Sequence, residues 1–340
     1  MNVIIVPKNI SSGVFDSQVF PLLIHSGASA LFFRTQSQAG LLMKEKRESD
    51  FQIIIGWLSL LKHLFVVSNF YTRDVFDFTK IFILRSFNLF RPNQHHDFRA
   101  LISEVSYMRH SSLSRKVILS TFEAFAFICS RNVSCVSNNL KRELHKRFYQ
   151  KKIDVIPCCI SIEEVLVTKY PMDKDKNSFV YIGSISAWQM FEESLCFYSK
   201  LNLEGKSLTV FTRDVEEAEN LLSKHSIDAE VISADREVVF EKLKRFSFGF
   251  VMRNDSLVNR TASPIKFMEY AANGVIPITT SHVGDYSNFF SDNILNIDFY
   301  GEGEQIDEVL DSLLSPENQS ELVNKAKKFT WQNYKHYLFG

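Results

Sequence analysis

Cysteines are few in this chain of 340 residues, and none has the spacing of a metal ligand or a redox pair. The five are Cys129, Cys135, Cys158, Cys159 and Cys196, an odd number without a CxxC pair. This pattern argues against a disulfide framework and favours a reducing compartment.

Several other signals are missing. The glycine pattern GxGxxG does not occur, which counts against a dinucleotide-dependent dehydrogenase. No zinc spacing, basic zipper or stacking motif accompanies the basic residues, so nucleic acid is not the expected partner. The formal net charge is zero, with 39 basic and 39 acidic residues.

Long apolar runs are also scarce. The sequence begins MNVIIVP, without the basic and apolar regions of a secretory signal, and we expect a cytoplasmic protein. The most apolar segment, FQIIIGWLSLLKHLFVV at 51–67, is interrupted by Lys62 and His63 and is too short to span a bilayer. We predict a buried helix near 48–62 that leads into a strand near 64–70.

The charges are unevenly distributed along the chain. Residues 1–160 hold 21 Lys and Arg against 11 Asp and Glu, whereas residues 161–340 hold 18 against 28. The segment KRELHKRFYQKK at 141–152 has two equally weighted interpretations, contact with an anionic membrane or lipid phosphate and a solvated helix face. The first interpretation places the protein at the inner face of the cytoplasmic membrane.

Strand and helix patterns alternate in both halves, which is typical of parallel, doubly wound sheets. The length fits two domains of about 150 residues each. Gly13 follows the first predicted strand, where the lack of a Cβ would let a ligand approach the backbone.

The most informative segment is RNDSLVNRTASPIKFMEYAANGVIPITTSHVGD at 253–285. Ser263 suits an N-cap and Pro264 the first position of a helix that ends near Gly274. Lys266 then lies in the first turn, where a cation costs about 0.3–1 kcal/mol unless an anion is near. A bound phosphate would reverse the sign of this effect.

This helix is flanked by the predicted strands FGFVM (248–252) and VIPIT (275–279), so its N-terminus would lie at the carboxyl edge of a sheet, where ligands bind. The arrangement suits a nucleotide diphosphate sugar, with Lys266 on the phosphates and Glu269 on the ribose hydroxyls. The alternative is a solvated Lys and Glu pair on a surface helix.

The run SPIKFMEYAANGVIP, with Arg253 and Asn259 before it and Gly284 and Asp285 after it, resembles the donor-binding signature of family 4 glycosyltransferases. YIGSISAWQ (181–189), IDVIPCCIS (153–161), QHHDFRALISE (94–104) and KFTWQNYKHY resemble other parts of that family in order. The resemblance implies a retaining enzyme with the GT-B fold, two Rossmann-like doubly wound domains facing a cleft, with a C-terminal helix that crosses back to the first domain.

The expected domains are an acceptor-binding domain at 1–155, a nucleotide-sugar-binding domain at 156–325 and a returning helix at 326–340. The implied reaction moves a hexose from a UDP-sugar or GDP-sugar to a glycan or lipid-linked acceptor, as in the synthesis of capsule or lipopolysaccharide, without a required metal or other cofactor. Cationic groups and the helix start would stabilise the leaving diphosphate.

The expected site residues fall into three groups. The catalytic group is His96, Asp97, Lys266 and Arg253, and the acceptor side adds Arg99 and Glu104. The donor side comprises Gly13, Gly183, Ser184, Thr212, Arg213, Asn259, Arg260, Ser263, Pro264, Ile265 and Glu269. The backbone N–H groups of Gly183 and Ser184 are expected to face the diphosphate, and Asp97 has the alternative of simply capping the next helix.

The chain departs from the family pattern at two places. Classical members carry a glutamate eight residues before Glu269, where this chain has Thr261, and many carry Arg and Lys where it has Trp188 and Gln189. Two alternatives therefore stay open, a nucleotide-sugar epimerase of the same fold and a non-catalytic binding protein.

Overall fold

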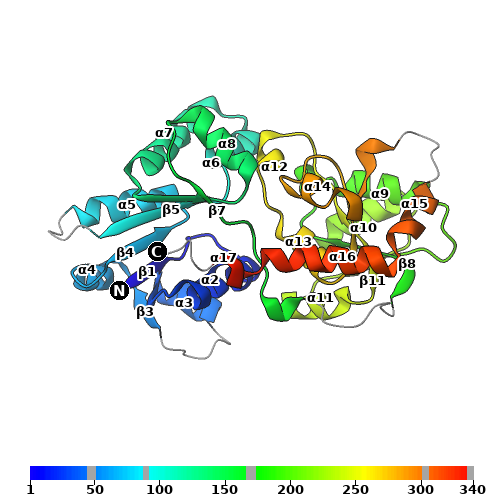
Figure 1. Ribbon diagram of the computed structural model, residues 1–340, viewed down its shortest axis with the longest axis horizontal. Helices are drawn as coiled ribbons and strands as arrows, with labels where there is room; N and C mark the ends of the chain where they lie inside the picture. The colour runs from blue at the N-terminus through cyan, green and yellow to red at the C-terminus, as the bar shows by residue number, and fades with distance from the viewer. Residues whose placement is uncertain (44–50, 87–91, 166–173, 301–305, 335–340) are drawn as a thin grey trace. The chain divides into compact units, whose positions relative to one another are not determined.

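The computed structural model describes residues 1–43, 51–86, 92–165, 174–300 and 306–334 (Figure 1). The chain divides into two compact units. The first comprises residues 1–159 and the segment that begins at Trp331, and the second comprises residues 160–330. The chain thus passes between units at 159/160 and 330/331, a few residues from the expected boundaries, and the roles expected of the two domains stay predictions.

The first unit contains a parallel seven-stranded sheet in the order β3-β2-β1-β4-β5-β6-β7. Its strands are β1 (Asn2–Ile5), β2 (Ala30–Phe33), β3 (Gln52–Ile55), β4 (Asn69–Thr72), β5 (Asn93–Phe98), β6 (Asn132–Cys135) and β7 (Asp154–Val155). Successive residues of a strand face opposite sides of a sheet. Accordingly, Ile4 and Val6 join one apolar cluster, whereas Val3 and Ile5 join another.

Helices cover this sheet (Figure 1). They are α1 (Ser12–Val14), the π-helix η1 (Phe15–Val19), α2 (Phe20–Ser26), α3 (Gln36–Met43), α4 (Trp57–His63), α5 (Val75–Arg85), α6 (Ile102–His110), α7 (Leu113–Cys129), α8 (Asn138–Arg147) and α17 (Trp331–Tyr334). Trp331 is fully buried in this unit, and its indole N–H donates to the carbonyl of Ser17 at 3.3 Å.

The second unit contains a parallel six-stranded sheet in the order β10-β9-β8-β11-β12-β13. Its strands are β8 (Asp175–Ile182), β9 (Ser207–Phe211), β10 (Glu230–Ile232), β11 (Phe246–Val251), β12 (Ile276–Thr279) and β13 (Leu295–Asn296). The chain builds outward from β8 on one side and from β11 on the other. The boundary between β8 and β11 is therefore the topological switch point, the place where open α/β sheets bind ligands.

The helical elements of this unit follow the strands in alternation. They are η2 (Ile162–Glu164), η3 (Ala187–Gln189), α9 (Phe191–Lys200), α10 (Val215–Lys224), α11 (Arg236–Leu243), α12 (Leu257–Arg260), α13 (Ile265–Ala272), α14 (Tyr286–Phe289), η4 (Ser291–Asn293), η5 (Ile297–Phe299), α15 (Ile306–Leu313), α16 (Pro316–Ala326) and η6 (Lys327–Phe329). Gly249 in β11 faces Tyr270 of α13 so closely that a Cβ would lie 2.6 Å from its ring. This missing side chain lets α13 lie close against the sheet.

The apolar segment 51–67 differs from its prediction. Residues 52–55 form strand β3, Gly56 breaks the chain direction at φ +80°, and only then does the short helix α4 begin. The next strand is β4 at Asn69–Thr72. A short apolar run does not distinguish a buried strand from a buried helix by its period, and the β-branched run Ile53–Ile55 favours the strand. The part of the predicted helix at 48–50 lies outside the described residues.

No helix in the described part of the chain is both long enough and apolar enough to cross a bilayer.

Candidate functional site

Helix α13 begins at the carboxyl edge of the second sheet, as the sequence predicts, but one residue later than expected. Pro264 is the N-cap and Ile265 the first helical residue. Ser263 therefore precedes the N-cap, and its hydroxyl hydrogen-bonds the hydroxyl of Tyr286 at 2.7 Å. The helix ends as predicted, with Gly274 in the left-handed region at φ +63°.

Lys266 in the first turn of α13 reaches across to the loop that follows β8. Its Nζ donates to Gln189 Oε1 at 2.6 Å. The same Nζ lies over Gly183, where a Cβ would come within 2.0 Å of it. Gly183 has φ +151°, a conformation that other residues rarely adopt. The ammonium group of Lys266 therefore lies against the backbone of Gly183, beside the switch point.

A second cation, Arg253, lies nearby at the end of β11. Its Nη1 donates to the carbonyl of Met252 at 3.0 Å, and its backbone N–H donates to Thr280 Oγ1. Burial, together with the Arg253 charge, lowers the pKa of Lys266 to about 7, although Glu269 acts in the opposite direction. Across the described ranges, no carboxylate forms an ion pair with either side chain. Two like charges share a partly desolvated space, which favours an anionic ligand.

Glu269 lies one turn deeper on the same helix and is mostly buried. Its Oε1 accepts from Nε and Nη2 of Arg236 at 3.0 and 2.9 Å. The Nη1 of Arg236 donates to Glu164 Oε1 at 2.5 Å. No hydrogen bond to the second oxygen of Glu269, Oε2, occurs among the described residues. One carboxylate oxygen is thus held by two donors of Arg236.

The loop after β8 has a different role from the one predicted for Gly183. The N–H of Gly183 donates to the carbonyl of Phe211 at 2.9 Å, so it is used within the sheet and does not face a diphosphate. The side chains that follow tie the loop together: Gln189 Nε2 donates to Ser184 Oγ, and Tyr181 OH donates to the Ser184 carbonyl at 2.7 Å. The contribution of Gly183 is the space it leaves for Lys266.

The end of β9 supports the same loop. Thr212 Oγ1 accepts from the N–H of Asp214 at 3.0 Å, and Asp214 Oδ2 accepts from the N–H of Ile185 at 2.9 Å. Arg213 is exposed. The predicted contacts of Thr212 and Arg213 with a nucleotide base stay predictions.

Asn259 and Arg260 follow β11 but lie in different surroundings. Asn259 is buried and donates to the carbonyl of Asn254 at 3.1 Å and to that of Trp188 at 3.4 Å. It therefore connects the two loops that border Lys266. Arg260 is largely exposed and forms an ion pair with Asp255 at 3.3 Å.

The loop after β12 also reaches the start of α13. A Cβ on Gly284 would lie 1.9 Å from the carbonyl oxygen of Ala262, and Gly284 adopts φ +66°. Its neighbour Asp285 precedes α14 (Tyr286–Phe289). The loops after β8, β11 and β12 thus meet at one place within the second unit.

In the first unit, Asp97 is the centre of a buried polar network at the end of β5. Its Oδ2 accepts from Tyr71 OH at 2.5 Å and from Arg73 Nε at 3.0 Å, and its Oδ1 accepts from Ser134 Oγ at 2.8 Å. Arg99 pairs with it at 3.4 Å. Burial alone would raise the pKa of Asp97, but Arg99, Arg73 and the hydroxyl donors hold that pKa below its usual value.

His96 lies on the opposite face of β5, packed against Phe78 and Phe98, with Nδ1 3.1 Å from Thr72 Oγ1. Burial lowers the pKa of His96 to about 3, against the effect of Asp97. The burial of His96 and Asp97 argues against direct contact with a substrate in this conformation, and their catalytic role stays a prediction.

The other residues predicted in the first unit also have protein partners. Glu104 pairs with Lys116 at 2.8 Å and with Arg147 at 2.7 Å. Arg99 donates to the carbonyl of Ile156 at 3.1 Å. Gly13 lies in α1, and a Cβ there would meet open space.

Sequence reasoning did not identify Arg236 or Arg73 as parts of these networks. Both follow strands at carboxyl ends of their sheets, which is the only signal that could have indicated them. Their partners are distant in sequence: Arg236 contacts residues 164 and 269, and Arg73 contacts Gln18 and Asp97.

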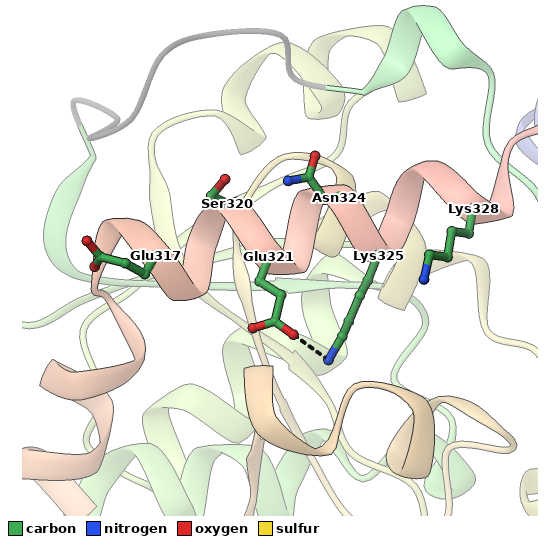
Figure 2. A pocket seen from close by; sticks show the side chains of 6 residues that line it. All are labelled: Glu317, Ser320, Glu321, Asn324, Lys325 and Lys328. Carbon is green, nitrogen blue, oxygen red and sulfur yellow. Dashed lines mark ion pairs between the residues drawn. The ribbon is translucent and has the colours of Figure 1, made fainter.

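Two other features, metal-ligating clusters and surface hollows, give no support to a catalytic site. No group of three or more His, Cys, Asp or Glu side chains within the described segments is placed to hold a metal ion. A hollow on α16 is lined by Glu317, Ser320, Glu321, Asn324, Lys325 and Lys328 (Figure 2). It lies along α16 and the following turn η6, and its Lys325 already pairs with Glu321 at 2.9 Å.

Comparisons with known proteins bear on the fold. No protein-family model and no curated protein sequence matches the chain. Among solved structures, HepE from Anabaena in complex with UDP-glucose is similar at a TM-score of 0.75 and 8% identity, over 99% of this chain and 97% of that one.

Two further structures agree. Sucrose-phosphate synthase from Thermosynechococcus elongatus gives a TM-score of 0.69 at 12% identity, over 98% of this chain and 96% of that one. The lipopolysaccharide outer core galactosyltransferase WaaB gives 0.65 at 14% identity, over 100% and 99%. Two parallel-sheet α/β units and this likeness establish the GT-B fold for the chain.

Proposed function

We propose that this protein is a retaining glycosyltransferase that moves a hexose from a UDP-sugar or GDP-sugar to a glycan or lipid-linked acceptor in cell-surface polysaccharide synthesis. One observation carries the proposal: Lys266 and Arg253 meet at the switch point of the second sheet without a carboxylate partner among the described residues. The fold agrees with it, and HepE of the same fold holds UDP-glucose.

In this proposal the leaving diphosphate lies against the start of α13. Lys266, Arg253 and the first helical N–H groups stabilise the negative charge that develops as the glycosidic bond breaks. Glu269 offers its free Oε2 to the ribose hydroxyls. These groups are fixed before the substrate arrives, so little reorganisation is needed. No metal ion is required for this charge stabilisation.

The test is a panel of UDP-sugars and GDP-sugars with wild-type protein, Lys266→Ala and Glu269→Ala. We expect transfer in the wild type and its loss in both variants, each of which should remain folded by circular dichroism, with Glu269→Ala less stable because Arg236 loses a mostly buried partner. NMR of the product should show the anomeric configuration of the donor retained. Full activity in both variants would reject the site.

A non-catalytic binding protein is the second candidate. Thr261, which replaces the first family glutamate, is buried and donates its hydroxyl to the carbonyl of Leu257 at 2.8 Å, so it contributes no charge. Hydrolysis or transfer of any donor would rule this candidate out. An epimerase of the same fold would convert the donor sugar without an acceptor, which product analysis with donor alone distinguishes.

We also propose contact with an anionic membrane, through α7 of the first unit. Leu113, Val117, Ile118 and Ile128 on one side of this helix are 66%, 65%, 56% and 55% exposed. Residues 101–152 hold 10 Lys and Arg but only three acidic residues. Of the acidic three, Glu123 is buried and Glu104 is paired. An exposed apolar helix face within a basic segment of the chain suits the surface of an anionic bilayer.

This proposal shifts the contact from the segment 141–152 to α7. Within that segment, Arg147 is paired with Glu104, and Lys151 Nζ donates to the carbonyl of Phe127 at 3.0 Å. We expect sedimentation with phosphatidylglycerol vesicles but not with phosphatidylcholine vesicles. Val117→Asp should weaken binding at least tenfold. Leu58→Asp, at a 79% exposed residue of α4, is the matched control and should not.

A further inference from the structure

Arg236 joins three parts of the second unit that are distant in sequence. It is the first residue of α11, where a cation is unfavourable by about 0.3–1 kcal/mol unless carboxylates lie close. Here two carboxylates surround it, Glu269 of α13 and Glu164 of η2. Its guanidinium also lies 5.2 Å from the ring centroid of Phe240. The guanidinium thus has carboxylates at its edge and the Phe240 ring against one face.

The contacts with Glu269 are asymmetric. Nε and Nη2 both donate to Oε1, at 3.0 and 2.9 Å, and leave Oε2 without a donor from the described residues. A carboxylate held at one oxygen has a fixed rotamer and can offer the other oxygen in a defined direction. Arg236 therefore prepares Glu269 to accept hydrogen bonds from a ligand.

The contact with Glu164 leads to the turn by which the chain enters the second unit. Glu164 Oε2 accepts from the N–H of Ser161 at 3.0 Å in a capping box. Ile160, one residue earlier, donates its N–H to the carbonyl of Phe329 at 3.0 Å and pairs with Thr330. The two segments that connect the units are thus joined to each other here, and Glu164 anchors one of them.

We propose that Arg236 is a positioning residue that orients Glu269 for the ribose of the nucleotide and, through Glu164, couples nucleotide binding to the entry turn at 161–165. This inference rests on the proposed function, because it needs a nucleotide at Glu269. When the ribose engages Oε2, the carboxylate and its guanidinium are held more firmly. Glu164 and the Ser161 amide that it caps are then held more firmly as well.

The experiment uses UDP and GDP alone, with the full chain. Affinity is measured by calorimetry, and hydrogen exchange of the peptide that contains 161–165 is followed with and without saturating nucleotide. In the wild type we expect the nucleotide to slow this exchange at least threefold. Arg236→Gln should weaken binding at least tenfold and abolish the slowing. Glu164→Gln should bind within threefold of the wild type but also lose the slowing, which separates the two roles.

Two further variants serve as controls. Arg245→Gln removes an exposed arginine of the same unit and should change neither quantity. Arg236→Lys keeps the charge but not the two-pronged contact, and should bind with intermediate affinity. If Arg236→Gln fails to fold by circular dichroism, the affinity of Arg236→Lys decides.

The outcomes are distinct. Wild-type affinity in Arg236→Gln, or in Arg236→Lys where that variant decides, overturns the positioning role while the proposed function stands. Slowing that persists in Glu164→Gln overturns the coupling. A wild type that binds neither nucleotide overturns the proposed function and this inference with it.

Discussion

The substitution Gly183→Ala tests whether the space left by Gly183 holds the Lys266 ammonium group in place. The new Cβ would lie 2.0 Å from Lys266 Nζ and 2.7 Å from Gln189 Oε1, so both side-chain ends must move. The residue must also keep φ +151°, which costs about 1–3 kcal/mol for a residue with a Cβ. For a unit of this size, that corresponds to a fall in melting temperature of roughly 2–12 °C.

The larger effect should be on nucleotide binding. A hydrogen bond to a charged group contributes about 1.5–3 kcal/mol, and each 1.4 kcal/mol is about tenfold in affinity. We therefore expect UDP or GDP to bind roughly 10–100-fold more weakly to Gly183→Ala. Calorimetric titration measures this directly.

Gly205→Ala is the matched control. Gly205 is in the same unit at φ +66°, and a Cβ there meets nothing within 4 Å. It should lose stability, by about 1–2 kcal/mol, and keep its nucleotide affinity. If Gly183→Ala binds the nucleotide as tightly as Gly205→Ala does, Lys266 is not held where the diphosphate lies and the reasoning is refuted.

Two further predictions concern charge. Because the pKa of Lys266 falls from 10.5 to about 7 on folding, the unfolded chain binds more protons between these values, so this group makes the free energy of unfolding rise with pH in that window. UDP should bind more weakly as pH rises from 7 to 9, by up to tenfold per unit, and Lys266→Met should abolish this dependence; a flat wild-type profile would contradict it. Asp97→Asn should cost about 3–5 kcal/mol in urea unfolding, because it leaves Arg73 and Arg99 without their buried counter-charge. The control Glu104→Gln, at a more exposed pair, should lower the free energy of unfolding by about 1 kcal/mol or less. If Asp97→Asn protein is fully stable but inactive, the result would instead favour the predicted catalytic role of Asp97.

The position of α13 could be predicted from the sequence because the residues that begin and end this helix act locally. Pro264 and Gly274 fix its two ends through backbone geometry, with no reference to the rest of the molecule. Ser263 shows the limit of that reasoning. Pro264 takes the N-cap position predicted for Ser263, and the Ser263 hydroxyl has a tertiary partner, Tyr286, 23 residues away, which a local pattern does not indicate.

The polar networks were less predictable. Residue type and strand ends placed Lys266, Arg253 and Asp97 at sheet edges, but they did not indicate how deeply each would be buried. Asp97 was expected to contact a substrate, and the structure surrounds it with protein donors. A sequence pattern says which residues gather at an edge, whereas burial depends on the side chains that cover them from other elements.

The pairing of Glu269 with Arg236 bears on why the site should select anions. Residues 161–340 carry an excess of ten acidic residues, so a cation there would ordinarily find a carboxylate. The carboxylate one turn from Lys266 is instead turned to Arg236, and Lys266 faces Arg253. Holding two cations together in a desolvated space is unfavourable, and a ligand with two negative charges removes that cost on binding. A neutral sugar gains nothing from it, so we expect the site to prefer a diphosphate because Arg236 holds the nearest carboxylate away from Lys266.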